Sequence, residues 1–129
     1  MIYIDSSVAL AHLLNETRSP PPDIWASEPV SSQLLEYEVW TRLNAYNAPQ
    51  ARKNDAADLL AGTMLVDLRP ETLDRLRLPF PVPLRTIDAI HLSTIHYLLG
   101  RNASVRLASY DARMYAAATA LGIPLYDLP

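Results

Sequence analysis

The segment MIYIDSSVAL, residues 1–10, contains the alternation of strand and helix that the rest of the chain repeats. Within it, Ile2–Ile4 is a short apolar run that predicts a buried β-strand, and Asp5 follows directly. Ser6 and Ser7 are residue types that cap helices, so we expect a helix to begin there. A strand that passes within a few residues into a helix is the first half of a β-α-β unit.

The same pattern recurs along the whole chain. We expect further short strands at Val30–Ser32, Leu65–Leu68, Val105–Ala108 and Pro124–Leu128. Helices are expected at Ile24–Ser27, Leu34–Tyr46, Pro49–Ala61, Pro70–Leu76, Thr86–Leu99 and Ala112–Leu121. Short strands that alternate with helices favour an α/β fold with a mainly parallel sheet between helical layers. No repeat or linker interrupts the pattern, so we expect residues 1–129 to form a single three-layer α/β/α domain.

The composition excludes several kinds of site. Half of the 129 residues are hydrophobic, which is enough for a proper core. The absence of cysteine excludes disulfides, a thiolate nucleophile and a Cys-ligated zinc site. A net charge of −3 does not indicate a broad basic surface for nucleic acid. Ten of the eleven basic residues are nevertheless Arg, the side chain best suited to bidentate phosphate contacts.

The chain shows no sign of a membrane segment. No unbroken apolar run approaches the roughly 20 residues that a transmembrane helix needs. The N-terminal residues lack the basic region and long apolar stretch of a signal peptide. We therefore expect a soluble, cytoplasmic protein.

Two acidic residues follow predicted strands. Asp5 comes directly after the first strand, and Asp111 follows the strand Val105–Ala108 by three residues. Sites in open parallel sheets form outside the carboxyl ends of the strands, where both residues would lie. The alternatives are structural, since Asp5 could start a turn and Asp111 could cap the next helix.

Two further acidic residues fall on the inward faces of predicted helices. At about 100° per residue, Glu38 projects into the apolar arc of its helix and Asp88 into that of the helix beginning at Thr86. A buried carboxylate is unfavourable unless it is paired or binds a cation. Arg42, one turn from Glu38, is the alternative partner. His91 is either a hydrogen-bonded core residue or a side chain that orients Asp88.

Together these four carboxylates point to a metal site. Crowding them without compensation would raise their pKa values and destabilise the fold, and a hard divalent cation removes that repulsion. Ligation by oxygen alone suits Mg²⁺, with Mn²⁺ as a substitute.

In these residues the sequence resembles the PIN-domain nucleases, and among them the VapC-type toxins of toxin–antitoxin pairs. The matching segments are Met1–Leu10 (MIYIDSSVAL), Ser31–Leu43 (SSQLLEYEVWTRL), Leu84–Ile95 (LRTIDAIHLSTI) and Leu107–Ile123 (LASYDARMYAAATALGI). Their order and spacing extend the resemblance over the whole chain. The middle, Asn44–Pro83, contributes only length and helix pattern.

The resemblance implies a PIN-like fold and a metal-dependent endoribonuclease that leaves a 5′-phosphate and a 3′-hydroxyl. By position, the four acids of the family's site correspond to Asp5, Glu38, Asp88 and Asp111. Asp5, Glu38 and Asp88 would hold Mg²⁺, and Asp111 would complete that site or help a second ion. The resemblance also places at Ser7 and Ser109 a small hydroxyl that faces the site, with helix capping or turn formation as the alternative. Arg85 and Arg113 lie beside these acids and are candidate phosphate contacts, with solvated surface charge as the alternative.

The resemblance also implies partners: an RNA substrate, a cognate VapB-type antitoxin in a type II toxin–antitoxin system, and a second copy of the chain in a homodimer. Such antitoxins often insert an Arg into the acidic cluster. Trp25 and Trp40 are candidate contact residues, with packing in the core as the alternative.

Three other kinds of protein share part of this pattern. A phosphatase of the haloacid dehalogenase type needs a second acid where this chain has Ser7. A receiver domain needs a Lys near the end of a late strand, but the only Lys is Lys53, in a predicted helix. A catalytically idle module that uses the same fold to bind protein or RNA remains open, although the complete set of four acids argues against it.

Overall fold

Four strands of three residues each form the centre of the molecule in the computed structural model, which describes all 129 residues. The strands are β1 (Ile2–Ile4), β2 (Val30–Ser32), β3 (Met64–Val66) and β4 (Arg106–Ala108). The helices are α1 (Ser6–Leu13), α2 (Asp23–Ala26), α3 (Leu34–Ala45), α4 (Gln50–Ala61), α5 (Pro70–Leu73), α6 (Thr86–Gly100) and α7 (Ala112–Ala120). The sheet has the order β3-β2-β1-β4, and every pair in it is parallel.

Parallel pairing follows from the helical connections between the strands. Each crossover carries the chain back to the same end of the sheet before the next strand begins. Tyr3, in the central strand β1, is in register with Val30 on one side and Leu107 on the other. All four strands therefore end at one edge of the sheet, and the segments that follow them meet there.

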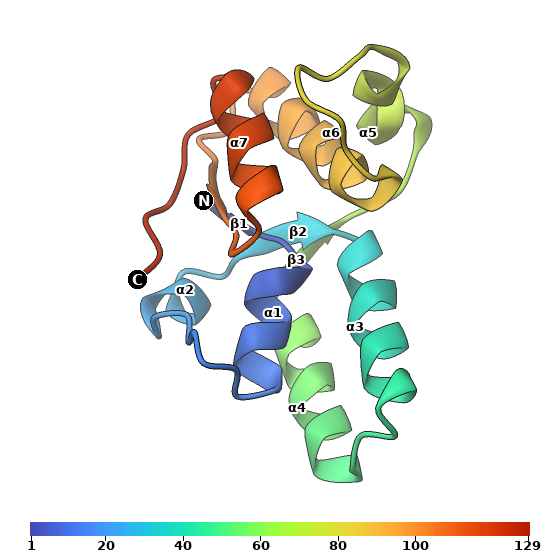
Figure 1. Ribbon diagram of the computed structural model, residues 1–129, viewed down its shortest axis with the longest axis vertical. Coiled ribbons are helices and arrows are strands. Elements are labelled where there is room, and N and C mark those ends of the chain that lie inside the picture. The colour runs from blue at the N-terminus through green and yellow to red at the C-terminus, as the bar shows by residue number, and fades with distance from the viewer.

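Alternation of side chains along β1 divides the core in two. Ile2 and Ile4 pack on the face covered by α1, α3 and α4, while Tyr3 packs on the opposite face. On that opposite face, Leu92 of α6 and Met114 of α7 pack with Tyr3. Figure 1 shows these two groups of helices on either side of the strands. The predicted three-layer α/β/α fold with a short-stranded parallel sheet is thus confirmed.

The predicted helices agree with the structure in place, with small shifts at their ends. The helix α6 is the longest, at 15 residues. No helix combines the length and the apolar character that crossing a membrane would require.

The start of α1 differs from the prediction that Ser6 and Ser7 cap it. Asp5 is the N-cap, and its Oδ1 accepts hydrogen bonds from the backbone N–H groups of Ser7 at 3.1 Å and Val8 at 3.4 Å. The strand ends one residue before the helix begins, so Asp5 alone keeps extended dihedral angles (φ −97°, ψ −179°) and takes the capping position.

Two other elements are shorter than expected. In place of the strand Pro124–Leu128 there is a single parallel bridge between Leu107 and Leu125. The helix expected over Pro70–Leu76 ends at Leu73 and continues as a 3-10 turn, Asp74–Arg77. Pro79 lies just beyond that turn and offers no N–H with which to extend a helix.

Candidate active site

The four acids predicted from the sequence lie in one cleft at the carboxyl edge of the sheet. Asp5 follows β1, Asp111 follows β4 as the N-cap of α7, Glu38 lies in α3, and Asp88 lies in the first turn of α6. The cleft has a volume of about 770 Å³. It is lined by Asp5, Ser6, Ser7, Leu10, Glu16, Arg18, Leu34, Tyr37, Glu38, Thr41, Arg42, Ala45, Arg85, Ile87, Asp88, His91, Tyr110 and Asp111.

Asp5 is the most deeply placed of the acids, with 4% of its surface exposed. Its Oδ1 accepts a hydrogen bond from Ser7 Oγ and its Oδ2 one from Ser109 Oγ, both at 2.5 Å. Burial raises the pKa of Asp5 above its ordinary value, although the hydrogen bonds from Ser109 and Ser7 and the nearby His91 act in the opposite direction. A negative charge on Asp5 is therefore unfavourable here without a further positive partner.

The hydroxyls of Ser7 and Ser109 tie the ends of β1 and β4 together. Ser109 Oγ accepts the backbone N–H of Asp111 at 3.0 Å, and Ser7 Oγ accepts that of Tyr110 at 2.9 Å. The two hydroxyl oxygens lie 3.4 Å apart. These serines hold both Asp5 and the segment that carries Asp111, so they are supports of the cleft and not ordinary turn residues.

Glu38 is held by a histidine. Its Oε1 lies 2.6 Å from Nε2 of His91, and only 13% of the Glu38 side chain is exposed. Arg42, the alternative partner considered for Glu38, instead lies over the ring of Tyr46 at 5.3 Å. Of the two alternatives for His91, the hydrogen-bonded core residue is confirmed, and its carboxylate partner is Glu38 of α3 and not Asp88.

Tyr3 forms the second hydrogen bond of His91, and the sequence analysis did not identify Tyr3 as a residue of the site. Its hydroxyl lies 2.7 Å from Nδ1 of His91 and accepts the backbone N–H of Ser32 at 3.1 Å. Burial raises the pKa of the Tyr3 phenol well above its ordinary value, so the group keeps its proton. The available signal was a tyrosine inside an apolar strand, because a buried phenol needs a polar partner.

Arg85 joins the other two acids. Its Nε lies 3.3 Å from Oδ2 of Asp88, and its Nη2 lies 3.7 Å from Oδ2 of Asp111. The Arg85 side chain is 69% exposed while that of Asp88 is only 8% exposed, so the guanidinium approaches the acids from the solvent side. A positive charge thus already lies between two carboxylates from distant parts of the chain.

The donor set of the cleft suits a hard cation in its chemistry. All four acids offer oxygen, and the buried charge of Asp5 lacks a cationic partner. As the side chains stand, no group of three Asp, Glu or His residues is arranged so that it could hold one ion. Each acid instead has a partner within the protein: Asp5 accepts from hydroxyls, Glu38 meets His91, and Asp88 and Asp111 both meet Arg85.

The basic residues of the cleft lie around its rim. Arg18, Arg42 and Arg85 line it, and Arg18 also donates to the backbone carbonyl of Tyr110 at 3.4 Å. Arg113, expected to contact phosphate, is exposed at the start of α7 and does not line the cleft. Guanidinium groups that can contact phosphate therefore lie beside the acids, although the cleft has more carboxylates than arginines.

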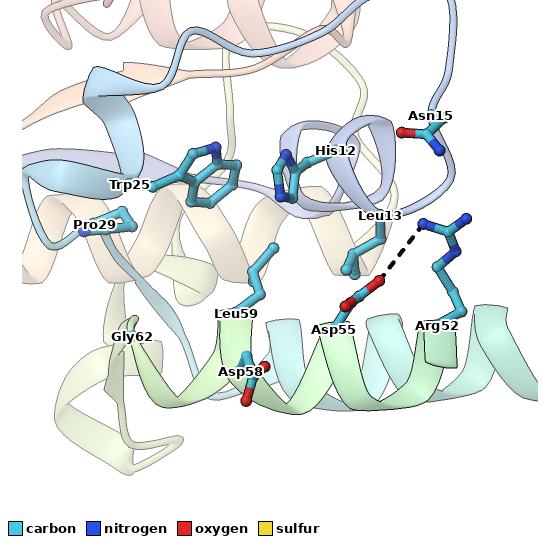
Figure 2. A pocket seen from close by; sticks show the side chains of 10 residues that line it. All are labelled: His12, Leu13, Asn15, Trp25, Pro29, Arg52, Asp55, Asp58, Leu59 and Gly62. Atoms are coloured by element: carbon cyan, nitrogen blue, oxygen red, sulfur yellow. Dashed lines mark ion pairs between the residues drawn. The ribbon is translucent and has the colours of Figure 1, made fainter. Parts of the chain in front are cut away.

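A second hollow of about 480 Å³ lies between α1, α2 and α4 (Figure 2). In it the rings of His12 and Trp25 lie next to each other, with centroids 4.8 Å apart and planes tilted by 46°, and Arg52 pairs with Asp55 at 3.8 Å. None of the predicted site residues lines this hollow. Trp25, like Trp40, also packs against the core, which supports the structural alternative for both tryptophans.

Comparison with known proteins adds one finding about this chain. The family model of the PIN domain matches residues 2–120, a range that includes all four acids of the cleft. No curated protein and no solved structure gives a significant match.

Proposed function

Because the chain belongs to the PIN domain family, we propose that it is a metal-dependent endoribonuclease that cuts RNA at the carboxylate cleft. PIN domains are generally nucleases, so the fold is that of a hydrolase acting on nucleic acid. The metal, the preference for RNA and the biological role are our proposal.

One observation carries it: five carboxylates line a single cleft, and four of them, Asp5, Glu38, Asp88 and Asp111, are the acids that the sequence singles out in four separate segments. A protein gains no stability from assembling Asp5, Glu38, Asp88 and Asp111 at one place, because their charges repel one another. Such an arrangement is typical of sites that bind a cation during function.

The residues that would hold Mg²⁺ are Asp5, Glu38 and Asp88, with Asp111 at the rim. When bound, magnesium supplies Lewis-acid activation of the scissile phosphodiester and of the attacking water. The hydroxyls of Ser7 and Ser109 orient the buried Asp5, while His91 holds Oε1 of Glu38 and leaves Oε2 without a hydrogen bond inside the protein. Because Arg85 contacts Oδ2 of Asp88 and would repel a nearby cation, we expect its guanidinium to move away from that carboxylate when an ion binds.

The arginines of the rim would hold the nucleic acid. A guanidinium binds phosphate through two parallel hydrogen bonds, and Arg85, displaced from Asp88, is well placed for the scissile group. Arg18 and Arg42 would contact neighbouring phosphates. Tyr37, 53% exposed beside Glu38, offers an aromatic face to an unstacked base. A phosphate contact by Arg113 stays a prediction.

The biological role that we propose is that of the VapC-type toxin of a type II toxin–antitoxin pair. The support is the order and spacing of the four motif segments, and the ability of the cleft to accept a guanidinium between Asp88 and Asp111. An antitoxin Arg could take the place that Arg85 occupies. The expected homodimer and the cytoplasmic location rest on the sequence alone.

The direct test is cleavage of a single-stranded RNA by the purified chain with Mg²⁺ or Mn²⁺. We expect products with 5′-phosphate and 3′-hydroxyl ends, and loss of at least about 100-fold in rate for Glu38→Gln or Asp88→Asn. Glu36→Gln is the matched control, because Glu36 lies in the same helix but does not line the cleft. Cleavage by Asp88→Asn at the wild-type rate would refute the site.

A second candidate function is a catalytically idle module that binds protein or RNA through the same fold. It is favoured by the internal partners of the carboxylates, which leave no three side chains arranged around one ion. The same assay separates the two, since an idle module leaves RNA intact with either metal. For the toxin role, induced expression followed by sequencing of RNA ends should reveal new 5′-phosphate ends that the Asp5→Asn variant does not produce.

A further inference from the structure

Three side chains from three different elements form a continuous chain of hydrogen bonds beneath the cleft. Tyr3 of β1 meets Nδ1 of His91 of α6 at 2.7 Å, and Nε2 of His91 meets Oε1 of Glu38 of α3 at 2.6 Å. Tyr3 is completely buried and His91 is 1% exposed. Solvent therefore does not reach the hydrogen bond between Tyr3 and His91.

The contacts of the Tyr3 hydroxyl indicate which atom donates the proton in each of these hydrogen bonds. The oxygen of Tyr3 accepts the backbone N–H of Ser32 at 3.1 Å, so its single proton is available for Nδ1 of His91. A neutral ring that accepts at Nδ1 carries its proton on Nε2 and donates it to Glu38. The ring is also held edge-on to Tyr3, with centroids 5.7 Å apart and planes at 82°.

The hydrogen bond from His91 restricts the orientation of the Glu38 carboxylate. A glutamate has a long, flexible side chain, and ordering it for a ligand has an entropic cost. The bond from His91 holds Oε1 in place and leaves Oε2 without a hydrogen-bond partner in a residue that lines the cleft. Hydrogen bonds of this kind orient metal-binding side chains, and their loss commonly weakens metal affinity about 10- to 100-fold.

We propose that Tyr3 and His91 are positioning residues that hold Glu38 in the orientation in which it binds a divalent cation. The inference rests on the proposed function in that it takes Glu38 as a metal ligand. It goes beyond that function by giving two buried residues, neither of which touches substrate, a measurable effect on the cleft.

The test is Mn²⁺ affinity of the full chain, measured from the free Mn²⁺ signal in electron paramagnetic resonance. Tyr3→Phe should weaken binding about 10-fold and His91→Phe about 100-fold, with His91→Gln between wild type and His91→Phe because Gln keeps an N–H for Glu38. Ser93→Ala is the matched control. It removes a buried hydroxyl of α6 that donates to the Thr72 carbonyl at 2.7 Å and does not line the cleft.

A second measurement does not depend on metal. Nitrogen-15 NMR of the metal-free wild type should show His91 protonated at Nε2 and not at Nδ1, and Tyr3→Phe should shift the ring toward a mixture of the two forms. If His91→Phe does not fold, this measurement and the Mn²⁺ affinity of Tyr3→Phe still test the positioning role. A merely structural role for the pair predicts lost stability in Tyr3→Phe and Ser93→Ala alike, with no selective loss of Mn²⁺ affinity.

The outcomes separate this inference from the proposed function. Folded Tyr3→Phe and His91→Phe proteins that bind Mn²⁺ as wild type does, or a wild-type ring protonated at Nδ1, would overturn the inference while leaving cleavage by wild type unaffected. Weakened Mn²⁺ binding in both variants, with RNA left uncut by wild type, would support the inference and refute the ribonuclease. A wild-type chain that binds no Mn²⁺ would refute both.

Discussion

Replacing Ser109 by Ala tests whether the buried hydroxyls stabilise the charge of Asp5. Ser109 is completely buried, and its Oγ both donates to Asp5 Oδ2 at 2.5 Å and accepts the backbone N–H of Asp111 at 3.0 Å. A hydrogen bond to a charged group contributes about 1.5–3 kcal/mol, and a neutral one contributes about 1 kcal/mol. Ser109→Ala should therefore lower the free energy of unfolding by about 3 kcal/mol.

The matched control is Ser31→Ala. Ser31 is equally buried, but its Oγ donates only to the neutral carbonyl of Ile4 at 2.7 Å, so we expect a loss of about 1 kcal/mol. Both variants should be unfolded in urea at pH 7 with EDTA, followed by circular dichroism. With a urea m-value of about 2 kcal/mol/M, the midpoint of Ser109→Ala should lie about 1 M below that of Ser31→Ala.

The interaction with Asp5 is isolated by a double-mutant cycle. In an Asp5→Asn background, most of the excess loss from Ser109→Ala should disappear, because the charged acceptor is gone. The reasoning would be refuted if Ser109→Ala were no more destabilising than Ser31→Ala, or if its effect were unchanged beside Asp5→Asn.

Three further predictions concern charge and metal in the same cleft. Burial raises the folded-state pKa of Asp5 above the ordinary value of 3.8, so the unfolded chain loses that proton first. The free energy of unfolding of the metal-free protein should then fall as the pH rises from about 3.8 through the folded-state pKa, and urea titrations should show a flatter profile for Asp5→Asn. Arg85→Ala should change stability by less than about 1 kcal/mol, since the guanidinium is largely exposed, yet calorimetry should show Mn²⁺ binding up to about fivefold tighter once the competing cation is gone. Mn²⁺ at about 100 times its dissociation constant should stabilise the wild type by about 2.7 kcal/mol, and a comparable gain for Asp88→Asn would contradict its role as a ligand.

The placement of the acids was predictable where it depends on rules that hold for any parallel sheet. Asp5 and Asp111 follow strands, and parallel strands end at a common edge, so strand assignment alone brings the two residues together. Glu38 and Asp88 were found by helical projection, because a carboxylate on an apolar face must meet a partner or a cation. These inferences need only the local period of the chain and the order of its elements.

The partners of those acids were not predictable from the sequence. Periodicity gives the face on which His91 lies but not the residue that it meets, which depends on how α3 and α6 pack on the sheet. For the same reason the sequence offers Arg42 as an ion-pair partner for Glu38, although in the structure Arg42 packs on Tyr46. The ion pair from Arg85 to Asp111 joins the N-terminal ends of α6 and α7, whose approach depends on how both helices pack and cannot be taken from local sequence.

The end of the chain shows another limit of pattern reasoning. Pro124–Leu128 has the apolar character of a strand, yet only Leu125 forms a bridge, with Leu107. The backbone around it makes two hydrogen bonds at 2.8 Å, from Leu107 N–H to Pro124 and from Tyr126 N–H to Leu107. A proline provides no donor to lengthen the ladder, so pairing stops after one bridge.

The most direct measurement is a crystal structure of the full chain grown with Mn²⁺, with the ion located by its anomalous scattering. We predict a peak in the cleft in contact with the carboxylates of Asp5 and Asp88, with the guanidinium of Arg85 moved off Asp88. A saturated crystal with no ion in the cleft, and with Arg85 still joining Asp88 to Asp111, would contradict the proposed metal site.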